Sequence, residues 1–216
     1  MKNAWPYLLT RALILALMCV AALSVCAATP EVESGEWNFE ATLDGKPIGT
    51  HRFVVSGTPQ AREVSSDASF VVRLLGIAVY RYKHHAEERW QGDCLRGLKS
   101  QTDDDGKPER VDQPFEGDCM MAFAYWNPRL VTQQKLVDPQ TGKVEAVKFE
   151  ALPDAQIMSR GQSVAAHGWR LQTSKQRITL WYAADTGRWL ALDADAKGGR
   201  KLSYRQVIAS KAPSTP

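Results

Sequence analysis

The residues best suited to chemistry lie in one stretch, residues 77–94 (IAVYRYKHHAEERWQGDC). This stretch contains two of the four histidines, two tyrosines, one tryptophan and a pair of adjacent glutamates. Histidine and glutamate are common proton donors and acceptors in enzymes, and histidine is also the commonest metal ligand. The first question is therefore whether the backbone of this stretch brings these side chains together.

A β-strand over residues 77–90 would separate the ionisable side chains. Successive side chains of a strand point to opposite faces, so His84 and His85 could not bind one metal ion. At a rise of about 3.3 Å per residue, His84 and Glu88 would lie about 13 Å apart, too far for direct proton transfer. Tyr82 and His84, about 6.6 Å apart, could contact one ligand. One face would carry the candidate binding residues of this stretch: Tyr80, Tyr82, His84, Glu88 and Trp90.

A helical turn over residues 84–90 is the alternative conformation. It would make His84 and Glu88 neighbours, because residues four apart lie on one side of a helix. His84 could then act as an acid or base together with Glu88 or Tyr82. The residues of this stretch permit both conformations, and the enzyme hypothesis stays open at this point.

The motifs of several common enzyme classes are absent from the sequence. It contains no G-x-S-x-G, no H-E-x-x-H, no phosphate loop and no dinucleotide-binding fingerprint. The acidic run at residues 103–106 (DDDG) lacks the closing glutamate of a calcium-binding loop and indicates a hairpin turn. We therefore assign no catalytic residue, and we expect neither a bound metal ion nor a cofactor.

The first 28 residues have the layout of a secretory signal peptide. Lys2 and Arg11 supply positive charge, residues 12–22 are apolar, and small residues follow at Cys26–Ala28. We expect cleavage after Ala27 or Ala28 and a periplasmic mature chain. Two alternatives remain: an uncleaved anchor, since residues 12–28 approach the length of a membrane span, and a lipoprotein cleavage box at residues 23–26. Membrane contact is left open, and integral membrane insertion is not expected after cleavage.

Two cysteines remain after removal of this leader, Cys94 and Cys119, and each follows Gly-Asp. In an oxidising compartment such a pair is read as a disulfide bond. A disulfide between them would close the loop of residues 94–119, and closing a loop of this length stabilises a fold by about 3 kcal/mol on the chain-entropy account. We predict a structural disulfide, since the spacing of the two cysteines does not suit a redox or metal motif.

The charge and length of the mature chain limit its functions. Without Lys2 and Arg11 the formal net charge falls from +3 to +1, so no strong basic field is present for nucleic acid. Residues 29–208 are long enough for one ordinary domain with a full core. Residues 209–216 are predicted to form a disordered tail. The oligomeric state does not follow from these features.

Most of the chain has the alternating pattern of β-strands. Residues 63–75 give the clearest example, because small and apolar side chains alternate with polar ones. A hairpin is predicted around Asp44–Gly45, and further turns around residues 138–142, 185–187 and 197–199. The predicted strands are residues 37–43, 48–56, 63–75, 77–90, 94–102, 143–151, 155–161, 163–173, 177–183, 187–194 and 200–208.

Residues 114–138 break this alternation. Aromatic and methionine side chains crowd around Cys119, and Asn127–Pro128 would interrupt any regular element. We expect an irregular apolar loop or short helical turn that crosses the domain. Its Tyr125 and Trp126 are further candidates for ligand contact.

These patterns predict an all-β protein with little helix beyond the signal peptide. About ten strands in one antiparallel domain are too many for a flat open sheet. We therefore expect a strongly curved sheet, a half-barrel or a barrel. Such a shape encloses a concave apolar face that can hold a ligand.

Several segments together resemble a bacterial family of exported proteins catalogued only as a domain of unknown function. The resemblance rests on residues 43–53, 80–84 with 88–90, 102–106 and 123–127, and would cover roughly residues 36–207. It implies a periplasmic β-rich domain and brings no established activity or catalytic residue. More distantly, the pattern is similar to exported proteins with curved sheets like those of lipoprotein carriers, an analogy of fold only.

The leading functional hypothesis is a periplasmic protein that binds an apolar or amphipathic molecule, such as a lipid, within the curved sheet. An enzyme of unknown class that uses His84 with Tyr82 or Glu88 is the second hypothesis. An envelope assembly or scaffold protein is the third, and it would present a flat apolar patch instead of a pocket. The identity of the ligand and of any protein partner is left open.

Overall fold

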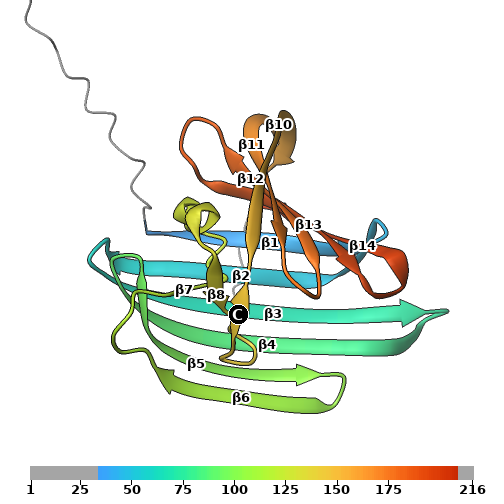
Figure 1. Cartoon of the computed structure of the whole chain (residues 1–216). Helices are drawn as coiled ribbons and strands as arrows, with labels where there is room; N and C mark the ends of the chain where they lie inside the picture. Colours follow the sequence, from blue (N-terminus) through green and yellow to red (C-terminus); the bar gives the residue numbers. More distant parts are fainter. Residues whose placement is uncertain (1–33, 209–216) are drawn as a thin grey trace, which may run out of the picture.

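The structure is a computed structural model that describes residues 34–208 (Figure 1). The predicted signal peptide (residues 1–28) and the predicted tail (residues 209–216) lie outside the described residues. Within residues 34–208 the chain forms fourteen strands and two short 3-10 helices. The all-β prediction is therefore confirmed. In the described part of the chain, no helix is long and apolar enough to span a membrane.

Eleven strands form one antiparallel sheet, in the order β10-β11-β12-β13-β14-β1-β2-β3-β4-β5-β6. The sheet is curved but not closed, and β10 and β6 are its two edges (Figure 1). The bounds of its strands are β1 (Gly35–Leu43), β2 (Lys46–Thr58), β3 (Ala61–Leu74), β4 (Ile77–Gln91), β5 (Cys94–Asp104), β6 (Lys107–Pro114), β10 (Lys148–Ser159), β11 (Gln162–Gln172), β12 (Arg177–Ala183), β13 (Trp189–Ala196) and β14 (Arg200–Gln206).

The first and last strands of the described chain meet in the middle of this sheet. β1 pairs with β2 on one side and with β14 on the other. The sheet thus joins an N-terminal half, β1–β6, to a C-terminal half, β10–β14. A 3-10 turn, η2 (Lys197–Gly199), connects β13 to β14 near the predicted glycine turn.

The irregular segment predicted between residues 114 and 138 is confirmed. It contains the two-residue strand β7 (Met121–Ala122), the 3-10 helix η1 (Pro128–Thr132) and the strand β8 (Lys135–Val137). β8 pairs with β7 on one side and with β9 (Val144–Ala146), which follows the segment, on the other. The side chain of Asn127 caps η1 by accepting a hydrogen bond from the backbone N–H of Arg129 at 3.0 Å. The aromatic residues of this segment belong to the main core cluster.

The core lies between the concave face of the sheet and this segment. Alternation along each strand directs one set of side chains inward, as in β1, where Trp37, Phe39 and Ala41 are buried. Phe39 packs against Trp189 of β13, with ring centroids 4.2 Å apart. From the other side, Trp126 and Leu130 are almost completely buried. The core therefore holds the two halves of the sheet and the irregular segment together.

The strand predicted at residues 77–90 is confirmed, since β4 runs from Ile77 to Gln91, and the alternative helical turn at residues 84–90 is not formed. One prediction about the strands was wrong. The two strands predicted at residues 143–151 and 155–161 are mainly one strand, β10, whose register shifts between Leu152 and Ala155. Pro153 at this shift lacks a backbone N–H, and an edge strand tolerates that loss.

Strand β6 was not predicted from the sequence. Its residues (KPERVDQP) are polar on both faces and mostly exposed, so they show no alternation. Charged residues and prolines are typical of strands at the edge of a sheet, where one side of the backbone meets solvent. The pattern that reveals a half-buried strand is therefore missing from this one.

Candidate functional site

The concave wall of the N-terminal half is built from rows of side chains that neighbouring strands bring side by side. One row runs from His51 of β2 through Ala68 of β3 and His84 of β4 to Thr102 of β5. Because all four side chains point to the same face, the small Ala68 leaves space between the two histidine rings. The strand pairing thus gathers residues that lie far apart in the sequence.

The next row of side chains along the strands also has small residues at its centre. It contains Phe53, Ser66, Ala86 and Ser100. Three of these side chains have only one heavy atom or two beyond the backbone, so they cannot fill the hollow of a curved sheet. The sequence therefore leaves space in the middle of the wall, while larger side chains close its ends.

A cavity of about 1090 Å³ lies against this wall. Across the cavity, the irregular segment contributes Phe123, Tyr125 and Trp126 to its lining. The C-terminal half of the sheet contributes apolar and aromatic side chains: Ile178, Leu192, Ala194, Leu202 and Tyr204. Polar and charged residues complete the lining: Asp138, Gln140, Thr141, Glu145, Gln172, Thr173, Ser174, Lys175, Gln176, Arg177 and Asp195. The cavity thus combines an aromatic interior with polar loops.

The two histidines of the wall are hydrogen-bonded to neutral groups. His51 contacts the hydroxyl of Ser66 through Nε2 at 2.8 Å, and His84 contacts the hydroxyl of Thr102 through Nδ1 at 2.8 Å. Burial, and secondarily the neighbouring His84, lowers the pKa of His51 to about 3. Burial also lowers the pKa of His84. Both imidazoles are therefore neutral at pH 7 and present uncharged polar atoms to the cavity.

Glu88 is a carboxyl buried in apolar surroundings. Its strand neighbours are Val64 and Leu98, and it accepts a hydrogen bond of 2.8 Å from the indole N–H of Trp90. Burial raises the pKa of Glu88 to about 7, although the hydrogen bond from Trp90 partly opposes this shift. A carboxyl of this kind changes its charge near neutral pH inside the cavity wall.

Aromatic rings line the wall beside the histidines. Tyr82 stacks on Phe70 and lies next to His84, with ring centroids 5.5 Å and 6.3 Å apart. Its hydroxyl donates a hydrogen bond of 3.3 Å to the side-chain oxygen of Gln140. Burial raises the pKa of Tyr82 and of Tyr125, so both phenols stay protonated. Tyr82 therefore joins the wall to the loop that follows β8.

Five of the seven predicted binding residues line the cavity: Tyr82, His84, Glu88, Tyr125 and Trp126. The other two do not. The hydroxyl of Tyr80 donates to Asp104 at 2.7 Å, beyond the end of the cavity. Trp90 is not part of the cavity lining and packs edge-on against Trp126, with ring centroids 5.4 Å apart. The predicted face is real, but the cavity occupies only its middle.

Sequence reasoning missed the other walls of the cavity, including Phe53, Ser66 and Tyr204. The small side chains along one face of residues 63–75 were a usable signal, because a curved face lined by serine and alanine is hollow. His51 lies on another strand, and its position next to His84 depends on the register of three strands. No local pattern encodes that register.

In the part of the chain that the structure describes, His84 makes no hydrogen bond to an acidic or basic side chain. The hydrogen bond of His84 goes to Thr102, and that of Glu88 comes from Trp90. Within residues 34–208, no group of three or more histidine, cysteine, aspartate or glutamate side chains is placed to hold a metal ion. His85 points to the outer face and pairs with Asp67, as strand alternation predicted. The enzyme hypothesis therefore stays an untested prediction.

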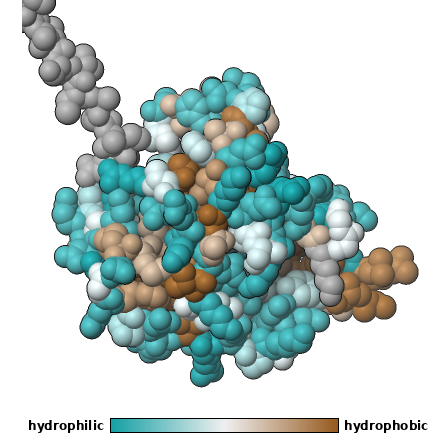
Figure 2. Space-filling model, in the orientation of Figure 1, coloured by the Kyte–Doolittle hydropathy of each residue, from teal (hydrophilic) through white to brown (hydrophobic). Residues whose placement is uncertain are grey.

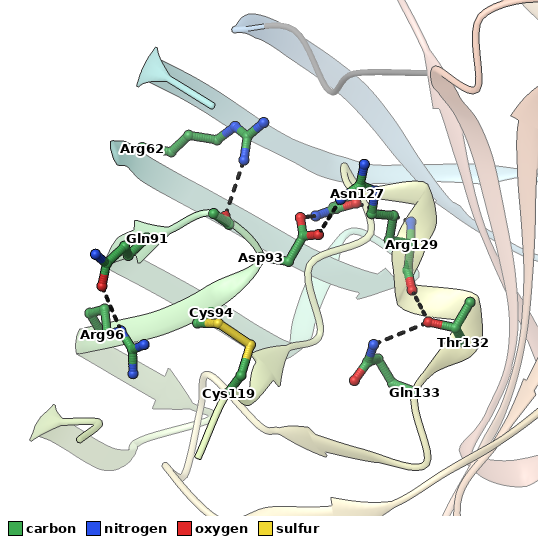
Figure 3. The surroundings of a disulfide bond; sticks show 11 residues. Arg62, Gln91, Asp93, Cys94, Arg96, Cys119, Asn127, Arg129, Thr132 and Gln133 are labelled. Carbon is green, nitrogen blue, oxygen red and sulfur yellow. Dashed lines mark hydrogen bonds and ion pairs between the residues drawn. A yellow bond between two sulfur atoms is a disulfide. The ribbon is translucent and has the colours of Figure 1, made fainter. Parts of the chain in front are cut away.

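The predicted disulfide between Cys94 and Cys119 is confirmed (Figure 3). It joins the start of β5 to the irregular segment. Beside it, Asp93 accepts hydrogen bonds from Asn127 at 2.9 Å and Arg129 at 2.7 Å. Arg62 donates to the backbone oxygen of Gly92 at 3.1 Å. These bonds fix the segment that carries Tyr125 and Trp126 against the end of the β3–β4 hairpin.

Comparisons with known proteins agree with this fold. A beta-barrel-like protein of the domain of unknown function DUF1849 from Brucella abortus superposes with a TM-score of 0.54 at 11% sequence identity. The match covers 80% of this chain and 94% of that one, and it shows a similar fold and nothing more. The MucA/MucB complex of Pseudomonas aeruginosa gives a TM-score of only 0.34 at 11% identity, over 79% of this chain and 49% of that one, and carries no argument.

A search of curated protein sequences gave no match. A family model, in contrast, matches residues 39–207, which include every strand of the sheet in whole or in part. This range agrees with the resemblance expected from the sequence motifs. The chain belongs to the family described as domain of unknown function DUF6134.

Proposed function

We propose that this protein binds an amphipathic, largely apolar molecule such as a lipid in the cavity of its curved sheet. The observation that carries the proposal is the cavity itself, of about 1090 Å³. Pockets for small molecules commonly occupy about 300–1,000 Å³ and combine apolar walls with a few placed polar groups. Phe53, Tyr125 and Trp126 supply the apolar wall, and His51 and His84 supply uncharged polar atoms.

The distribution of charge along the lining supports an amphipathic ligand. The inner wall combines aromatic and aliphatic side chains with two neutral histidines and Glu88. By contrast, Lys175, Arg177 and Asp195 belong to loops and strand ends of the C-terminal half. An apolar chain would displace water from the interior. A polar head group would remain beside the charged residues, where it keeps its hydration.

We also propose that the mature protein works in the periplasm. The apolar leader at residues 12–28 supports export. The disulfide between Cys94 and Cys119 supports an oxidising compartment, since such bonds are rare in the cytosol. Fractionation of cells that express the full chain tests this point. Mature protein without residues 1–28 in the periplasmic fraction is expected, and full-length protein confined to the cytosol would overturn it.

Native mass spectrometry of protein extracted gently from expressing cells tests the ligand proposal. We expect peaks heavier than the chain by the mass of a bound lipid, which disappear after denaturation. We also expect the emptied protein to take up members of a panel of fatty acids and phospholipids. A clean unliganded mass combined with no uptake from the panel would refute the proposal.

A cavity-filling substitution gives a sharper test. Ala194 lines the cavity from β13, so Ala194→Trp places an indole where the ligand would lie. Ala165→Trp on the exposed face of β11 is the matched control. We expect Ala194→Trp to weaken uptake by about ten-fold or more and Ala165→Trp to leave it unchanged. Equal uptake by both folded variants would place the ligand elsewhere and contradict the proposal.

A further inference from the structure

The hairpin of β3 and β4 extends beyond both of its neighbours in the sheet. Pairing with β2 ends at Phe70, and pairing with β5 ends at Tyr82. β3 and β4 nevertheless remain paired with each other as far as Leu74 and Ile77. We call residues 71–81 the free tip. At about 3.3 Å per residue it projects about 13 Å past the sheet.

The free tip carries four of the eight large apolar side chains that are exposed in the described chain, including Leu75, the most exposed of them. Leu75 is 95% exposed, and Leu74, Ile77 and Val79 are 64%, 69% and 51% exposed. Figure 2 shows them as a brown projection at the side where the β3–β4 hairpin ends in Figure 1. Scattered single apolar residues on a surface need no explanation, but four within six residues at a protruding point do.

The turn at the end of the free tip adds an independent observation. Leu75 has a backbone φ of 50° and is followed by Gly76. The same geometry occurs at Asp44–Gly45, Asp105–Gly106 and Arg160–Gly161, where a polar residue, twice an aspartate, occupies the left-handed position. Aspartate and asparagine tolerate this conformation, whereas a bulky apolar residue is strained there. The chain therefore retains a leucine where both backbone strain and exposure to water disfavour it.

The charges on the free tip are all positive. Arg73 and Arg81 are its ionisable residues apart from Tyr80, and Lys83 follows directly on β4. The guanidinium of Arg73 donates to the backbone oxygen of Gly76 at 3.2 Å and so lies beside the apolar turn. Acidic residues also lie beside the base of the free tip: Asp104 accepts a hydrogen bond from Tyr80, and Asp105 accepts one from the backbone N–H of Arg81.

We propose that the free tip inserts into the surface of a phospholipid bilayer. The apolar side chains of Leu74, Leu75 and Ile77 would enter the region between head groups and acyl chains, which interfacial segments penetrate by about 5–10 Å. Arg73 and Arg81 would then meet the lipid phosphates, with which guanidinium groups form paired hydrogen bonds. A convex, narrow ribbon with apolar side chains at its point suits a fluid surface better than a flat protein partner.

This surface lies outside the cavity, and its test does not depend on what the cavity holds. The purified mature chain is mixed with vesicles of phosphatidylethanolamine and phosphatidylglycerol, and binding is measured by flotation. The test variant is Leu75→Asp combined with Ile77→Asp. The matched control is Met158→Asp, which removes another exposed apolar side chain, on β10 at the edge of the sheet.

We expect the double variant to lower the vesicle partition coefficient by about ten-fold or more, and Met158→Asp to change it by less than about two-fold. Unfolding midpoints at or above that of the parent chain establish that the variants fold. Equal binding of the double variant and the parent chain would overturn the proposal.

A fluorescent label attached at Leu75→Cys gives a second measurement. We expect its emission to shift to shorter wavelength on vesicles, while a label at Ala165→Cys does not shift. No shift at position 75 would overturn the proposal. A dimer in solution that the double variant dissolves would do so as well, because it would assign the free tip to a second copy of the chain.

Discussion

The two ends of the β3–β4 hairpin differ sharply in burial and in strand pairing. At one end, Trp90 is buried against Trp126, and the disulfide of Cys94 lies a few residues away. At the other end, Leu75 is fully in water and the strands lack neighbours on both sides among the described residues. The cavity lies between these two ends. One hairpin thus connects a fixed base, a hollow wall and an exposed point.

The contrast in burial suggests that one end of the hairpin stabilises the fold and that the other end contacts a binding partner. Substitutions at the base of the hairpin should lower the free energy of unfolding, because they remove buried contacts or covalent constraint. Substitutions at the free tip should leave stability unchanged or improve it, since little is packed there. If both ends respond alike, the contrast drawn from burial is wrong.

Truncation of a buried aromatic residue should have the largest effect. Trp126 is 1% exposed, so Trp126→Ala is expected to lower the free energy of unfolding by about 3–5 kcal/mol. Ile77→Ala at the free tip is the control and should change it by less than about 0.5 kcal/mol. Urea denaturation of both variants measures the difference. Comparable losses at the two positions would contradict the contrast.

Removal of the disulfide should cause the second-largest loss in the free energy of unfolding. The bond closes a loop with a sequence separation of 25. Replacing both cysteines by serine is expected to cost about 3 kcal/mol, because the unfolded chain regains the entropy that the cross-link removes. Thermal unfolding with and without a reducing agent checks the result: the parent chain should become less stable on reduction and the double variant should not. Insensitivity of the parent chain would count against a structural role.

Glu88 should make the stability of the base depend on pH. Its pKa rises from 4.5 in the unfolded chain to about 7 in the folded protein. The folded state therefore binds more protons between these values, and the free energy of unfolding falls as pH rises through this window and levels off above it. The expected loss is about 2–3 kcal/mol.

Urea denaturation at pH 5 and pH 8 measures the contribution of Glu88. Glu88→Gln should reduce the loss of stability between these two conditions, because an amide does not ionise. Glu87→Gln, on the exposed side of the same strand, is the matched control and should keep the pH dependence of the parent chain. An unchanged pH dependence in Glu88→Gln would show that other groups cause it.

The smallest change is expected at the turn of the free tip. Leu75→Asn places a residue that tolerates the left-handed conformation at φ 50°. It should raise the free energy of unfolding by about 0.5–1 kcal/mol, provided that Leu75 makes no compensating contact. Thermal unfolding compared with the parent chain measures this gain. A clear loss of stability would reveal packing of Leu75 that its exposure does not show.

Alternation along single strands predicted correctly which side chains share a face, but it did not predict which of them are buried. The inward set on residues 63–75 was identified from its small and apolar side chains, and Val64, Ala68 and Phe70 are buried. The same pattern continued to Leu74, which is 64% exposed. A local pattern states which side chains share a face. It does not state where the neighbouring strands end, and that decides which of them are covered.

The cavity itself could be predicted only in part. Tyr82, His84 and Glu88 were identified because they share one face of one strand. His51 and Tyr204 join them because strands that are distant in the sequence pair in the sheet. The Nδ1 atom of His51 lies 3.4 Å from the hydroxyl oxygen of Tyr204. Strand register over such distances depends on the whole sheet. The disulfide was easier, because two cysteines allow only one pairing.

The pairing of β1 with β14 bears on how the chain folds. β1 lies in the middle of the sheet, yet one of its two neighbours is the last strand of the described chain. During synthesis the meander β1–β6 can form from local hairpins, but β1 keeps an unpaired edge until residues 200–206 arrive. Contacts between such distant residues slow folding. An open edge in the centre of the sheet during this interval makes the incomplete chain prone to aggregation.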